Sequence, residues 1–156
     1  MDARIGLANP VAGKVVKYLV SADRAVAETT VPASTLELVK LRASQINGCG
    51  FCTDMHTKDA EAAGESSTRL NLVAVWREAT VFTDAERAAL ELTEQGTRIA
   101  DGAGGVSDEA WADAVVYFDE DQLAALVCQI AVINAFNRAN VMVKRPAGDY
   151  QPGQFG

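Results

Sequence analysis

The chain is a succession of segments with helical periodicity, and short turns rich in glycine or in helix-capping residues separate them. Alanine and leucine are abundant, whereas the alternating β-branched and aromatic residues typical of strands do not occur in runs. Two sequence signatures of a capping box, Ser34 with Glu37 and Thr83 with Glu86, mark the starts of helices. Together these features predict an all-α fold.

Seven helices are expected, at about residues 10–20, 34–46, 49–64, 67–76, 83–99, 107–115 and 119–141. The helix at 34–46 is apolar around more than half of its circumference, so we expect it to be buried on several sides. The residues after Pro146 are rich in glycine and proline, which predicts an arm or a frayed end. Because no repeat or long linker divides the sequence, we expect a single domain over residues 1–156.

Length and charge exclude several classes of protein. With 156 residues, of which 49% are hydrophobic, the chain is long enough to bury a core of its own. The net charge of -7 disfavours a nucleic-acid partner, because phosphate binding requires a basic surface. The first residues lack the features of a secretory signal, and no apolar run is long enough to span a bilayer. We therefore expect a cytoplasmic protein without a membrane partner, and in the cytosol a cysteine pair is more often catalytic or metal-binding than structural.

Two of the three cysteines, Cys49 and Cys52, are separated by two residues, and the only histidine, His56, follows the second by four positions. Side chains four residues apart lie on one face of a helix, so Cys52 and His56 can lie close together. Gly48 ends the preceding helix, which places Cys49 near a helix N-terminus, where the dipole stabilises a thiolate. His56 can accept the proton of Cys52 or stabilise its thiolate as a cation. This spacing indicates a redox site or a metal site.

Glu37 is the best candidate for a carboxylate that orients the imidazole of His56. It lies in an apolar stretch of the preceding helix, where an unpaired charge would be costly. A helical hairpin through residues 47–48 would place the two helices side by side, but it does not by itself fix which residues face each other. The pairing of Glu37 with His56 is therefore a hypothesis. The structural alternative is a capping box with Ser34, and the two roles are compatible.

Residues 37–56 resemble the core motif of the AhpD-like alkylhydroperoxidases, which belong to the carboxymuconolactone decarboxylase superfamily. The motif is a glutamate twelve residues before a CxxC pair, followed by a histidine four residues after the second cysteine. This chain has all four positions, in Glu37, Cys49, Cys52 and His56, together with the Arg-x-Ser-Gln-x-Asn-x-Cys run between them. Residues 82–87 and 133–138 extend the resemblance over most of the chain.

The resemblance implies a thiol peroxidase cycle that needs no cofactor or metal ion. Cys52 would attack the hydroperoxide and become a sulfenic acid, and Cys49 would resolve it to a disulfide. Glu37 and His56 would form the proton relay. An external dithiol, from a lipoylated protein or a peroxiredoxin-type partner, would reduce the disulfide, and the protein would form trimers or hexamers. This chain departs from the best-studied branch at Phe51, which stands where that branch has a second relay histidine.

Other functions use the same residues. Cys49, Cys52, His56 and Glu37 could supply four ligands to zinc, although no second ligand pair of the kind found in structural zinc sites is present. A non-catalytic helical oligomer or a redox sensor is a third possibility.

Structural roles are expected for the remaining notable residues. Cys128 is expected to be inert core, and hydrogen bonds between helices or subunits are expected for Asn134, Asn137 and Arg138. The aromatic residues expected to anchor a core or an interface are Trp76, Trp111 and Phe118.

Overall fold

The computed structural model describes residues 2–102 and 104–155, and in that part of the chain it contains helices and turns but no strand. The predicted all-α fold is confirmed. The helices are α1 (Pro10–Ala27), α2 (Ala33–Ile46), α3 (Gly50–Ala62), α4 (Ser67–Leu72), a 3-10 turn (Val73–Val75), α5 (Asp84–Thr97), α6 (Asp108–Tyr117) and α7 (Glu120–Met142). None of the helices in residues 2–102 and 104–155 combines the length and the apolarity needed to cross a bilayer.

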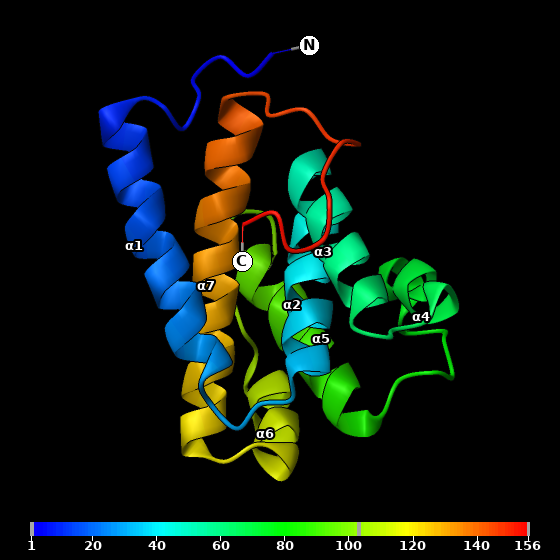
Figure 1. Ribbon diagram of the computed structural model, residues 1–156. Helices are drawn as coiled ribbons and strands as arrows, with labels where there is room; N and C mark the ends of the chain where they lie inside the picture. Colours follow the sequence, from blue (N-terminus) through cyan, green and yellow to red (C-terminus); the bar gives the residue numbers. More distant parts are fainter. Residues whose placement is uncertain (1, 103, 156) are drawn as a thin grey trace.

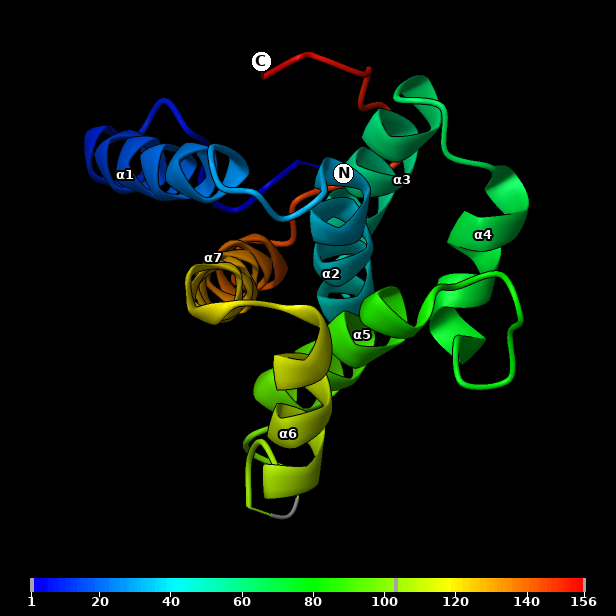
Figure 2. The same ribbon diagram turned by 90° about the horizontal axis from the view of Figure 1, so that it is seen from below.

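Helix α2 is the centre of the fold and packs against α3, α5 and α7 (Figure 1). α7 lies between α1 and α2, while α5 crosses beneath α2 and carries α6 on its other side (Figure 2). Val39 of α2 packs in a core cluster with residues of α5, α6 and α7, whereas Leu38 and Leu41 pack in a second cluster with Trp76 and Leu90. All three α2 side chains are at most 1% exposed, so the predicted burial of this helix on several sides is confirmed.

Local capping fixes the starts of several helices. Thr83 and Glu86 form the predicted capping box at the start of α5, and Ser107 and Asp119 cap α6 and α7. The predicted capping box at Ser34 is wrong, because α2 begins at Ala33 without any side-chain cap. Glu37, whose carboxylate was expected to complete that box, contacts Lys40 on α2 and His56 on α3 instead.

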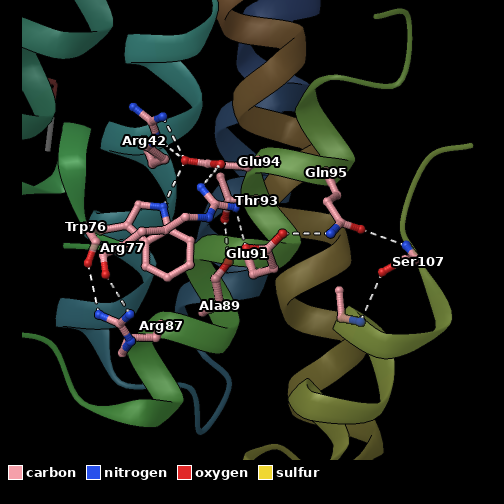
Figure 3. Close-up of polar contacts among 11 residues, drawn as sticks. Arg42, Trp76, Arg77, Arg87, Ala89, Glu91, Thr93, Glu94, Gln95 and Ser107 are labelled. Atoms are coloured by element: carbon pink, nitrogen blue, oxygen red, sulfur yellow. Dashed lines mark hydrogen bonds and ion pairs between the residues drawn. The ribbon is translucent and has the colours of Figure 1, made fainter. Parts of the chain in front are cut away.

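A buried carboxylate, Glu94 on α5, connects α2 and the 3-10 turn to α5 (Figure 3). It accepts hydrogen bonds from Arg42 Nε and Trp76 Nε1, each across 2.8 Å, and forms an ion pair with Arg77. Burial acts to raise the pKa of Glu94, but these three donors outweigh it and lower the pKa. The ionised Glu94 therefore fixes the position of α2, from which part of the candidate site projects.

Of the two outcomes expected for the residues after Pro146, an arm and a frayed end, the structure shows an arm that packs along α3 (Figure 1). The Gly148 amide donates to Asp54 Oδ2 across 2.8 Å, and Tyr150 is only 5% exposed. The Tyr150 hydroxyl donates to Asp59 across 2.8 Å. Glycine and proline content marked the tail as irregular, but irregular backbone still packs when an aromatic side chain and hydrogen bonds hold it.

The prediction that Cys128 is core is also wrong, because this cysteine is exposed. Leu126 and Ile130 point into the core from the same helix. Cys128 follows Leu126 by two positions and so lies about 200° further around the helix, which points its side chain away from that core. Trp76 and Phe118 are buried as expected, whereas Trp111 is 42% exposed.

Candidate active site

The cysteine pair lies where the chain turns from α2 into α3. α2 ends at Ile46, and Gly48 adopts a φ of 64°, a conformation that favours glycine. Cys49 is the N-cap residue of α3, and its Sγ accepts a hydrogen bond from the backbone amide of Cys52 across 3.4 Å. Both cysteines are free thiols and are at most 2% exposed. The pair is therefore held at a helix N-terminus, as the sequence predicts, but beneath the protein surface.

The two thiols differ in acidity. The hydrogen bond from the Cys49 thiol, together with donors on Asn140 and Asn137 and the charge of His56, outweighs burial and lowers the pKa of Cys52 to about 6. As the donor to Cys52, and because it is buried, Cys49 has a raised pKa. Asn140 Nδ2 on α7 lies 3.2 Å from the Cys52 sulfur. Near neutral pH, Cys52 is thus the thiolate and Cys49 remains a thiol.

Glu37 on α2 contacts His56 on α3, as hypothesised, with 3.1 Å between Glu37 Oε2 and His56 Nδ1. The other carboxylate oxygen accepts a hydrogen bond from Lys40 Nζ across 2.7 Å. Burial acts to raise the pKa of Glu37, but the His56 hydrogen bond and the Lys40 charge outweigh it and lower the pKa to about 2. An ionised Glu37 favours a proton on His56 Nδ1, which leaves Nε2 to exchange protons with other groups.

Three of the four predicted residues, Glu37, Cys52 and His56, line one cavity of about 410 Å³. Cys49 does not line the cavity, and its sulfur accepts a hydrogen bond from the backbone amide of Cys52, which does. Among residues 2–102 and 104–155, no hydrogen bond joins the imidazole of His56 to either sulfur. The side chains are therefore gathered around a shared space and do not form a continuous hydrogen-bonded chain.

The cavity walls are mainly apolar and come from α1, α2, α3 and α7, together with residues before α1 and after α7. Phe51, which stands in place of a second relay histidine, packs edge to face on Tyr150 with their ring centroids 6.3 Å apart. Tyr150 in turn stacks on Phe155 at 5.8 Å. The apolar lining residues are Leu7, Val16, Val20, Phe51, Met55, Ile133, Phe136, Tyr150 and Phe155. Position 51 thus supplies a wall of the cavity and carries no proton.

Polar residues of α7 hold the cysteine turn in place. Asn47 donates to both Asn134 and Asn137, across 3.0 and 2.9 Å, and Asn137 donates to Ser44 across 3.0 Å. The predicted role of the α7 asparagines in bonds between helices is confirmed. Sequence reasoning did not place Asn140 beside Cys52, although Asn134, Asn137 and Asn140 recur every three residues and so share one helix face.

The structure gives the zinc alternative no ligand cluster. Among the residues that it describes, no three or more His, Cys, Asp and Glu side chains are grouped to hold a metal ion. The Glu37 carboxylate is bonded to Lys40 and His56, and the Cys49 sulfur is directed at Cys52.

Comparison with known proteins identifies the family and the fold. The model of the carboxymuconolactone decarboxylase family matches residues 13–95. The uncharacterized protein YdfG of Bacillus subtilis is 36% identical over 131 residues, which are 84% of this chain and 88% of YdfG. A crystal structure of an Agrobacterium tumefaciens protein of unknown function, whose description links it to AhpD and antioxidant defence, has a TM-score of 0.88 at 32% identity. The match covers 96% of this chain and 100% of the other. The debrominase Bmp8 has a TM-score of 0.77 at 18% identity, over 90% of this chain and 73% of its own, which shows a shared fold alone.

Proposed function

Because the chain belongs to the carboxymuconolactone decarboxylase family, we propose that it is an AhpD-like thiol peroxidase that reduces alkyl hydroperoxides in antioxidant defence. One observation carries the proposal. Cys52, with a pKa of about 6, lines the same cavity as the Glu37–His56 pair. A thiolate nucleophile and a proton donor on the walls of one apolar cavity are the groups that peroxide reduction requires. The family resemblance and this geometry support the same reaction.

In the first step the Cys52 thiolate attacks the terminal oxygen of the hydroperoxide. A sulfur–oxygen bond forms as the O–O bond breaks, which gives a sulfenic acid on Cys52 and an alkoxide. The protonated His56 donates its Nε2 proton to the alkoxide, so that an alcohol leaves. Glu37 contacts Nδ1 of His56 across 3.1 Å and so orients the ring for this transfer. Cys52 and His56 line the same cavity, so an alkoxide released at Cys52 can reach the imidazole.

In the second step the Cys49 sulfur attacks the sulfenic sulfur of Cys52. A disulfide forms, the sulfenic hydroxyl takes up the proton released by Cys49, and water leaves. The contact between Cys49 Sγ and the Cys52 amide keeps the two side chains adjacent. A dithiol then returns the pair to thiols and becomes a disulfide itself. We propose a lipoylated protein or a peroxiredoxin-type partner as its source.

A single-turnover assay tests this function. Reduced protein carrying Cys128→Ser, which removes the exposed thiol, is mixed with cumene hydroperoxide, and the remaining peroxide is measured over time. We expect each protein chain to consume one equivalent of the hydroperoxide, and Cys128→Ser and wild type should do so at the same rate. Adding Cys52→Ser should abolish consumption, whereas adding Cys49→Ser should retain the first step and stop at the sulfenic acid. Equal rates with and without Cys52→Ser would overturn the assignment.

We also propose that the protein is a homo-oligomer, a trimer or a hexamer, in the cytoplasm. Apolar side chains that are at least 42% exposed recur on one face of α1 and on α6, and they support this proposal because grouped exposed apolar side chains mark interaction surfaces. They are Val11, Val15, Tyr18, Trp111, Val115 and Val116. A stable monomer in light scattering at micromolar concentration would contradict it.

A further inference from the structure

The carboxylates that line the active-site cavity all have partners within the protein. Lys40 lies between Glu37 and Asp23, at 2.7 and 3.7 Å, and Asp23 also accepts a hydrogen bond from the amide of Gln129. Asp59 accepts the hydroxyl of Tyr150 with both of its oxygens, at 2.8 and 2.9 Å. Each of these carboxylates therefore already has a hydrogen-bond or ion-pair partner within the protein.

The guanidinium groups of Arg24 and Arg145 also line the cavity. In the part of the chain that the structure describes, neither forms an ion pair with a carboxylate. Arg24 is exposed, but Arg145 is half-buried. Burial lowers the pKa of Arg145, and only the charges of Cys52 and Cys49 act in the opposite direction. Arg24 and Arg145 are thus cations of the cavity without a carboxylate partner, and the negative charge that acts on Arg145 is that of the cysteine pair.

Aromatic rings fix the orientation of Arg145. Its Cζ lies 3.7 Å from the centroid of Phe51 and 5.3 Å from that of Phe155. A guanidinium stacked on a ring keeps its N–H bonds in its own plane, where they remain free to donate to a planar anion. Arg145 is therefore preorganised to bind a carboxylate with two parallel hydrogen bonds.

We propose that the substrates of this site are amphipathic acids, hydroperoxides whose apolar body lies against the aromatic walls and whose carboxylate is bound by Arg145. That the ligand carries a hydroperoxide group rests on the proposed function, whereas the binding of a carboxylate by Arg145 does not depend on it. Arg145 also neutralises the ligand, which otherwise would be repelled by the Cys52 thiolate. A monoanionic carboxylate fits the apolar walls better than a dianionic phosphate, because each buried charge must be desolvated.

The cavity size agrees with such a ligand. Its volume of about 410 Å³ is within the range of small-molecule sites. Cys52 and the Glu37–His56 pair line this cavity from α2 and α3, and Arg145 lines the same cavity from the segment that follows α7. A molecule held at Arg145 can therefore present a second functional group to Cys52.

Calorimetric titration with octanoate and with octanamide, its uncharged isostere, tests the acid site without any redox step. We expect wild type to bind octanoate about tenfold more tightly than octanamide, which is within what a charge-assisted hydrogen bond contributes. Arg145→Gln should remove this preference and leave octanamide binding unchanged, and Arg145→Lys should keep part of it. The matched control is Arg98→Gln, which changes the net charge equally at an exposed residue that does not line the cavity.

Two outcomes of the titration would overturn the proposal. One is equal affinity of wild type for the two ligands, and the other is an Arg145→Gln variant that loses both ligands equally, which would indicate a structural role for the side chain. The catalytic comparison uses hydroperoxyoctanoic acid and its methyl ester, for which wild type should show the higher kcat/KM with the acid. Equal values would refute the substrate class while the peroxidase function stands. If neither is reduced, the proposed function fails and the octanoate titration still decides the acid site.

Discussion

Asn140→Ala removes one identified hydrogen bond from the reactive thiolate and leaves the rest of the site in place. The hydrogen bond from Cys49 is the largest cause of the lowering of the Cys52 pKa from the usual 9.0 to about 6, followed, against the effect of burial, by Asn140, Asn137 and His56. A hydrogen bond to a charged group contributes about 1.5 kcal/mol, or about one pKa unit. We therefore expect a Cys52 pKa of about 7 in the variant, with the thiolate fraction at pH 6 reduced from about one half to about one tenth.

The pKa is read from the ultraviolet absorbance of the thiolate as the pH is raised, in Cys128→Ser protein so that only Cys52 titrates in this range. Asn134→Ala is the matched control. It removes an asparagine from the same face of α7 whose side chain bonds Thr97 and Asn47 and not the sulfur. Asn134→Ala should reduce stability without moving the titration midpoint. An unchanged midpoint in Asn140→Ala, or an equal rise in both variants, would refute the reasoning.

Two further predictions concern the carboxylate and the tail. The pKa of Glu37 is depressed from 4.5 to about 2, so its pairing stabilises the folded state above pH 4.5, and this contribution is lost as the pH falls toward 2. In urea unfolding, Glu37→Gln should be less stable than wild type by about 3 kcal/mol at neutral pH. That difference should shrink below pH 4.5, and a pH-independent difference would contradict the assignment. Tyr150→Ala should let a bulky maleimide alkylate Cys52 several times faster, because the buried ring holds the tail against α3. Tyr150→Phe, which loses only the bond to Asp59, should have a smaller effect, and equal rates in all three proteins would show that the tail does not restrict access.

The sequence predicts best those features that depend on residues close together in the chain. The capping box at Thr83 was predictable because each of its bonds spans three residues. α1 continues to Ala27, beyond the expected end near residue 20, and its last turns are largely exposed, so no apolar stripe marks them. The capping-box signature at Ser34 was misleading. Glu37 has the right spacing, but its carboxylate contacts Lys40 and His56 and does not cap the helix.

The site follows the same rule. Glu37, Cys49, Cys52 and His56 fall within one helical hairpin, so their spacing already limited how they could meet. The Glu37–His56 contact needed the structure because the hairpin's rotation depends on packing against α5 and α7. Asn140 and the tail contact the site from about 90 positions away in the sequence. The hydrogen bonds between Asn140 and Cys52 and between Lys58 and Gly148 both span this separation. Contacts between residues this far apart produce no local sequence pattern, so they could not be predicted from the sequence.

The most direct test of the account is to identify the thiols that are oxidised when reduced protein receives one equivalent of an organic hydroperoxide. Peptide mass spectrometry after alkylation of the remaining thiols distinguishes the products. We predict one intrachain disulfide between Cys49 and Cys52, with Cys128 alkylated as a free thiol. Protein in which Cys49 and Cys52 both remain alkylatable after the peroxide has been added, or in which oxidation is confined to Cys128, would contradict the central claim that the buried pair is a peroxidase centre.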